Sequence, residues 1–101
     1  MIAVITTTVS TQKDALKIGK KLLDDHLIVC SNINKTLSQY YWKGQFHEEE
    51  EFQLSVKTTI EKKEQAIKCI NMMHPYETPM IVSKNFEISN SYKAWMDQLI
   101  G

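Results

Sequence analysis

The chain has 101 residues, of which 43% are hydrophobic and 24% charged, a composition typical of ordinary soluble domains. Twelve acidic residues balance twelve basic ones, and every basic residue is a lysine. Without arginine or net positive charge the chain lacks the usual means of holding phosphates and base edges, so we expect no nucleic-acid partner. No run approaches the ~18 apolar residues of a membrane span. We therefore expect residues 1–101 to form a single domain with no membrane partner.

The first predicted elements are a strand and a helix. The strand covers Ile2 to Thr8 and begins apolar on both faces, which favours a central position in its sheet. Thr11 then stands where an N-cap residue is expected. Behind it, apolar residues recur at helical spacing, and Gly19 lies among them. A glycine inside a helix weakens it by ~1 kcal/mol, so we expect the helix to approach the sheet closely at this point.

A long hairpin is predicted next. Leu27 to Ile33 begins a second strand, which resumes over Leu37 to Trp42. Lys43-Gly44-Gln45 is typical of a tight hairpin connection, and a third strand returns from Phe46. Its later residues alternate apolar and polar with period two, so one face of this strand is expected in the core.

Two more helices and one strand complete the chain. Thr58 and Glu61 have capping-box spacing and predict the start of the second helix. Pro79 to Phe86 predicts a fourth strand at a sheet edge, and Ser89 to Ile100 a final amphipathic helix. The order βαββαβ plus a C-terminal helix predicts an α+β fold, a ferredoxin-like sandwich. Both crossover helices would cover one face of the sheet. The other face, together with the aromatic residues around the hairpin (Tyr40, Tyr41, Trp42 and Phe46), is then expected to contact another chain.

The tetrapeptide His74-Pro75-Tyr76-Glu77 brings an imidazole, a phenol and a carboxylate to one helix-to-strand junction. Pro75 predicts that the helix ends here, and the negative end of its dipole favours a protonated His74. These residues predict a binding site at the rim of the molecule. A plain helix stop before an edge strand accounts for the same tetrapeptide.

Blocks of residues spread over the whole chain carry a resemblance to a known family. They are Thr7-Thr8, Cys30-Ser31-Asn32-Ile33, Tyr40-x-Trp42-x-Gly44, Glu51, Lys57-Thr58, His74-Pro75-Tyr76-Glu77 and Tyr92-x-x-Trp95. In this order they resemble the CutA family. The resemblance implies a homotrimer, PII-like and packed through its sheets, without enzymatic activity. It also implies a part in divalent-cation tolerance, with copper as the usual named ion.

The resemblance and the residues together suggest a ligand cleft between subunits. We expect the hairpin of a neighbouring subunit to bring two wall residues to the C-terminal end of the second helix. The expected ligand is a metal ion or a small anion, held by ammonium, imidazole and phenol donors. No cofactor is required, although copper or another divalent cation could bind. The cleft residues are Lys57, His74, Tyr76 and Glu77, with Trp42 and Glu51 as walls.

The expected metal ligands are Cys30 and His74, because thiolate and imidazole suit copper. Binding should be weak, since Met80 stands where CutA sequences commonly have a glutamate, which removes a carboxylate ligand. The two cysteines, Cys30 and Cys69, form no CxxC pair and suit a reducing compartment, so we expect a cytoplasmic protein.

Two other functions compete with this one. In the first, Cys30 and His74 form the thiolate pair of a small enzyme, but no other catalytic motif supports it. In the second, the βαββαβ order belongs to an RNA-recognition module. That module needs stacking aromatics on its central strands and a basic sheet, whereas the first strand offers Ile2 to Thr6.

Overall fold

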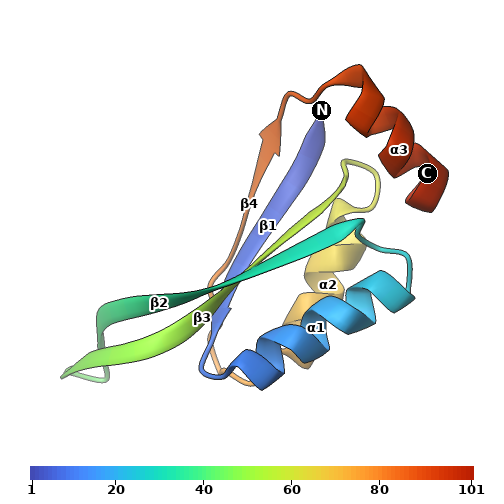
Figure 1. Ribbon diagram of the computed structural model, residues 1–101. Coiled ribbons are helices and arrows are strands. Elements are labelled where there is room, and N and C mark those ends of the chain that lie inside the picture. Colours follow the sequence, from blue (N-terminus) through green and yellow to red (C-terminus); the bar gives the residue numbers. More distant parts are fainter.

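The computed structural model describes all residues, 1–101, and confirms an α+β fold. Its four strands form one antiparallel sheet in the order β2-β3-β1-β4. Helices α1 and α2 lie on one face of this sheet, and α3 lies near the end where the chain begins (Figure 1). This is the predicted ferredoxin-like sandwich with an additional C-terminal helix. The elements are β1 (Ile2–Val9), α1 (Gln12–Asp24), β2 (Cys30–Trp42), β3 (Gln45–Thr59), α2 (Lys63–Met73), β4 (Ile81–Phe86) and α3 (Asn90–Ile100).

The main core lies between the sheet and helices α1 and α2. As predicted, β1 is central and β4 is an edge strand. The Thr11 hydroxyl accepts a hydrogen bond from the Asp14 N–H at 3.1 Å and so caps α1. A Cβ on Gly19 would lie 3.0 Å from Ser31 Oγ, which explains the glycine. The fully or nearly fully buried members of this core are Ile5, Val9, Ala15, Ile18, Leu22, Ile28, Leu54, Val56, Ala66 and Ile70.

A smaller second core holds α3 against the sheet end. Ser89 caps this helix by accepting a hydrogen bond from the Tyr92 N–H at 3.4 Å. Met96 and Ile100 are buried against Ile2, the first residue of β1, and Val29, the residue before β2. The final helix therefore stabilises the end of the sheet opposite the hairpin tip. None of the three helices is long and apolar enough to span a membrane.

The structure corrects two of the predicted element boundaries. The second strand is continuous from Cys30 to Trp42, since β3 pairs with it along its whole length. The predicted capping box at Thr58 is wrong. This residue is fully buried within β3, and its hydroxyl donates a hydrogen bond to the Leu27 carbonyl at 2.6 Å. Helix α2 begins later, at Lys63, without a side-chain cap.

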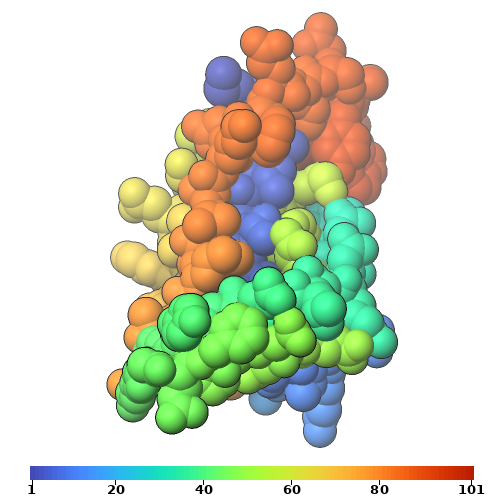
Figure 2. Space-filling model, turned by 90° about the vertical axis from the view of Figure 1, so that its left-hand side faces the viewer, coloured from blue at the N-terminus to red at the C-terminus, as the bar shows by residue number.

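On the face of the sheet opposite α1 and α2, helix α3 covers only one end, where it packs over Ile2, Val4 and Cys30. Strand β1 (blue) is visible there between β4 (orange) and the β2–β3 hairpin (green and teal) in Figure 2. The strand register and the period-two alternation of strands place large, partly exposed apolar side chains on this face. They are Tyr40, Trp42, Val82 and Phe86, each between 38% and 52% exposed. Such an apolar surface is typical of a contact with another chain.

The hairpin turn offers a first testable prediction. Lys43 and Gly44 both have positive φ angles, 53° and 78°, as in the two-residue turns that suit twisted strands. We expect Gly44→Ala to lower the free energy of unfolding by about 1 kcal/mol, because L-residues are strained in this region. Lys43→Asn should raise it, since asparagine tolerates the same angles. Urea unfolding of both variants at one protein concentration checks this, and equal shifts in the same direction would contradict it.

Candidate functional site

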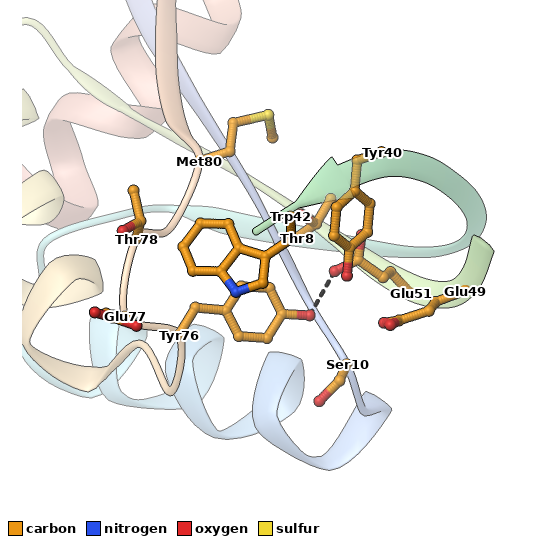
Figure 3. Close-up of a pocket in the computed structure, with 10 residues that line it drawn as sticks. All are labelled: Thr8, Ser10, Tyr40, Trp42, Glu49, Glu51, Tyr76, Glu77, Thr78 and Met80. Atoms are coloured by element: carbon orange, nitrogen blue, oxygen red, sulfur yellow. Dashed lines mark hydrogen bonds between the residues drawn. The ribbon is translucent and has the colours of Figure 1, made fainter. Parts of the chain in front are cut away.

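A cavity of about 400 Å³ opens on the side of the sheet opposite α1 and α2. It forms where the hairpin curves past the end of β1 and meets the segment between α2 and β4 (Figure 3). Side chains from these three places point into the same space. The lining residues are Thr8, Ser10, Tyr40, Trp42, Glu49, Glu51, Tyr76, Glu77, Thr78 and Met80.

The floor of the cavity is built on a buried carboxylate. Glu51 is only 5% exposed and accepts a hydrogen bond at Oε2 from the Tyr76 hydroxyl (Figure 3). Burial of the phenol, together with this hydrogen bond and the charge of Glu51, raises the pKa of Tyr76 well above its usual value. Tyr76 is therefore a neutral, permanent donor, and its proton holds the carboxylate in place.

His74 positions this tyrosine rather than lining the cavity. Its Nδ1 accepts the Tyr76 backbone N–H at 3.1 Å, so Nδ1 carries no proton. Its Nε2 lies 2.9 Å from both the Thr8 carbonyl oxygen and the Thr7 Oγ1. The ring is therefore neutral, with Nε2 donating to the Thr8 carbonyl. Burial lowers the pKa of His74, against an opposing hydrogen bond to Thr8.

These contacts correct two expectations for His74. The helix dipole favours a protonated ring at the rim, but the side chain is only 9% exposed and its environment favours the neutral form. Because one nitrogen accepts a hydrogen bond and the other donates one, His74 has no free lone pair for a metal ion. His74 therefore holds Tyr76 in position and does not itself bind a metal ion.

The structure brings four of the predicted cleft residues together in one chain: Trp42, Glu51, Tyr76 and Glu77. Glu51 already meets Tyr76 within the same chain, so this wall of the cavity forms without a neighbouring subunit. The cause is the curvature of the long hairpin, which carries its outer half toward the loop before β4 (Figures 1 and 3).

Two predicted site residues lie elsewhere. Lys57 and Cys30 face each other across β2 and β3, and Lys57 Nζ donates to the Asn32 side-chain oxygen at 2.6 Å. Lys57 pairs with Val4, whereas His74 contacts the far end of β1. At ~3.4 Å per residue along a strand and ~4.8 Å between strands, Cys30 lies well beyond contact with His74. The chain alone thus assembles neither the expected metal pair nor the thiolate pair of the alternative enzyme.

The charge of the cavity also differs from the expected one. Three carboxylates line it, Glu49, Glu51 and Glu77, and no lysine does. This lining opposes a small anion, so the prediction of an anionic ligand is not supported by the site. No group of three or more histidine, cysteine, aspartate or glutamate side chains is arranged to hold a metal ion within the chain.

Several lining residues were missed from sequence, and a signal for some of them was present. Glu49 lies two residues before Glu51 on β3 and therefore on the same face. Tyr40 shares that face with the predicted wall residue Trp42, through the register of β2 with β3. Thr8, Ser10 and Thr78 carry no such signal, because their places depend on how the chain curves at the end of β1.

Comparison with known proteins gives a consistent family. The family model of the CutA1 divalent ion tolerance protein matches residues 3–99. The divalent-cation tolerance protein CutA of Thermotoga maritima is 37% identical over 101 residues, which cover 99% of each chain. The protein of the same name from Thermococcus kodakarensis is 30% identical over 98 residues, covering 96% of this chain and 94% of the other.

Solved structures agree with the sequence comparison. The periplasmic divalent cation tolerance protein CutA of Archaeoglobus fulgidus superposes with a TM-score of 0.94 at 30% identity, covering 100% of both chains. The divalent cation tolerance protein of Thermus thermophilus gives a TM-score of 0.89 at 32% identity, again over 100% of both chains. Since sequence and structure agree over nearly the full length, this chain belongs to the CutA1 divalent ion tolerance family.

Proposed function

We propose that the chain acts as a non-enzymatic homotrimer that binds divalent cations, copper among them, in clefts between its subunits. All residues, 1–101, would serve as one CutA-like domain. The observation that carries the proposal is the carboxylate-lined cavity beside an exposed apolar sheet face. Carboxylate oxygens are suitable ligands for divalent cations.

The position of the cavity supports a cleft between subunits. It opens on the same face as the partly exposed Val82 and Phe86. Copies that packed through this face would bury these side chains, at ~25 cal/mol per Å² of apolar area, and would close the cavity from one side. Lys57 lies on this face too, by its register with Val4. In a trimer it could reach a neighbour's carboxylates and complete the cleft, or form an ion pair that only holds the subunits together.

A cytoplasmic location is part of the proposal. Both cysteines are free, which suits a reducing compartment. The Archaeoglobus fulgidus relative is described as periplasmic, which is a statement about that protein.

The assembly is tested by sedimentation at micromolar concentration. We expect a trimer, because the apolar sheet face needs a partner. A monomer would contradict both the trimer and the clefts between subunits. Lys57→Met separates the two roles of the lysine: loss of metal binding in an intact trimer indicates a cleft residue, whereas a weakened trimer indicates an ion pair between subunits.

The metal ligands are tested by anaerobic titration of the trimer. With Cu(II), Glu49→Gln and Glu77→Gln should each weaken binding about tenfold if the cavity holds the ion. With Cu(I), Cys30→Ala should abolish a weak site, because thiolate is the soft ligand. His74→Ala, if the variant remains a folded trimer, should leave Cu(I) affinity unchanged, since both ring nitrogens are engaged. Equal affinities in all variants would remove these residues from the ligand set.

A further inference from the structure

We infer that the cavity beside Tyr76 binds an organic cation through its ammonium group. The inference goes beyond the proposed function, because it assigns to the same cavity a class of ligand other than a metal ion. It depends on three properties of the cavity: the sign of its charge, the aromatic rings in its wall, and a volume too large for a bare ion.

The charge of the lining selects a cation. Glu51 is nearly fully buried, and Tyr76 occupies only its Oε2, which leaves Oε1 available to a ligand. Glu49 and Glu77 also line the cavity, on opposite sides of it, and add two further carboxylates (Figure 3). A buried carboxylate with a free oxygen favours a positively charged partner that donates hydrogen bonds. An ammonium group provides both the charge and the donors.

The aromatic rings add a second means of recognition. Trp42 and Tyr40 line the cavity next to these carboxylates (Figure 3). His47 stacks on the Tyr40 ring with centroids 5.1 Å apart, which fixes the ring in place. Lys43 Nζ lies 5.7 Å from the centroid of Trp42, so this ring already attracts an ammonium group of the chain itself. Aromatic faces beside carboxylates are the chemistry that binds alkylammonium ligands.

The dimensions favour an organic ion over a bare metal. The cavity volume of about 400 Å³ lies within the usual range for small-molecule sites. No three potential metal ligands converge in it, so one chain cannot close a coordination shell around an ion. The hydroxyl groups of Thr8, Ser10 and Thr78 can accept further hydrogen bonds from a polar ligand of this size.

The experiment uses tryptophan fluorescence of the full-length protein. Trp95→Phe leaves Trp42, in the cavity wall, as the single reporter. Choline, tetramethylammonium and putrescine are the probes, and 3,3-dimethyl-1-butanol is the uncharged analogue of choline with the same shape. We expect saturable changes with the ammonium probes and at least tenfold weaker binding of the alcohol. No saturable change with any ammonium probe at millimolar concentration would overturn the inference, as would equal binding of choline and the alcohol.

Neutralising a negative or a positive side chain at the cavity should have opposite effects on choline binding, which sharpens the test. Glu49→Gln and Glu77→Gln should each weaken choline binding severalfold, while the exposed Glu87→Gln, outside the cavity, should not. Lys43→Met removes an ammonium group that competes for Trp42, so choline should bind equally well or more tightly. Weaker choline binding in Lys43→Met, or unchanged binding in both glutamate variants, would contradict a cation site.

The result can be separated from the proposed function. Sedimentation and Cu(II) titration are performed on the same samples. A trimer that binds Cu(II) but no ammonium probe would overturn only the organic-cation inference. A monomer that still binds choline with the expected charge dependence would support the inference and contradict the trimer.

Discussion

Tyr76→Phe is expected to lower the free energy of unfolding by about 2 kcal/mol, although it removes a single oxygen atom. The Tyr76 hydroxyl is the hydrogen-bond donor to Glu51, whose side chain is almost fully buried. Without this hydroxyl, the Glu51 carboxylate would stay partly desolvated and would lose one hydrogen bond. Leaving a buried group unsatisfied costs ~1–3 kcal/mol, and more when the group is charged. Urea unfolding at a fixed protein concentration measures the change, since association also contributes to stability.

A matched substitution on the other side of this hydrogen bond serves as the control. Glu51→Gln keeps an oxygen that can accept from Tyr76 but removes the charge. We therefore expect a smaller loss of stability than in Tyr76→Phe, together with a lower pKa for the Tyr76 phenol, because the nearby negative charge helps to raise it. Equal losses in the two variants would show that the charge of Glu51 contributes nothing to the effect.

The fold could be predicted from sequence because it depends on local patterns. The helix start at Thr11, the turn at Lys43-Gly44 and the helix stop before Pro75 are each fixed by one or two residues. The prediction of a capping box at Thr58 was wrong, because the position of this residue does not depend on a local pattern. The same threonine has a partner far away in sequence, the Leu27 carbonyl, and this tertiary contact determined its place.

The site was harder to predict, because its contacts join segments that are distant in sequence. Tyr76 meets Glu51 across 25 residues, and His74 meets Thr7 across 67. The tetrapeptide could be identified as unusual, but nothing in it indicates that His74 turns inward while Tyr76 turns toward the hairpin. Lys57 is expected to join these residues only across a subunit boundary, and the register of β3 places it toward the other end of the sheet within its own chain.

His74→Ala is the substitution from which we expect the largest loss of stability, about 2–4 kcal/mol at neutral pH. The side chain joins the end of β1 to the segment after α2, through the Thr8 carbonyl, the Thr7 hydroxyl and the Tyr76 N–H. Its removal leaves several buried polar groups without partners, each worth ~1–3 kcal/mol. His26→Asn is the control, because His26 is exposed and asparagine tolerates its positive φ of 58°. A loss below 1 kcal/mol for His74→Ala would contradict the positioning role.

The same residue predicts how stability depends on pH. Burial lowers the pKa of His74 in the folded protein below the ~6.5 of an unfolded histidine. Between these two values the unfolded chain binds more protons, so stability rises with pH; it is complete above ~6.5 and is lost as the pH falls toward the folded pKa. Protonation would place a hydrogen on Nδ1, where the Tyr76 N–H now donates, and would release the tyrosine from the cavity floor. Unfolding measured from pH 7.5 to 5.5 should show this slope in the His26→Asn control and a smaller one in His74→Ala, whereas parallel curves would assign the slope to other groups.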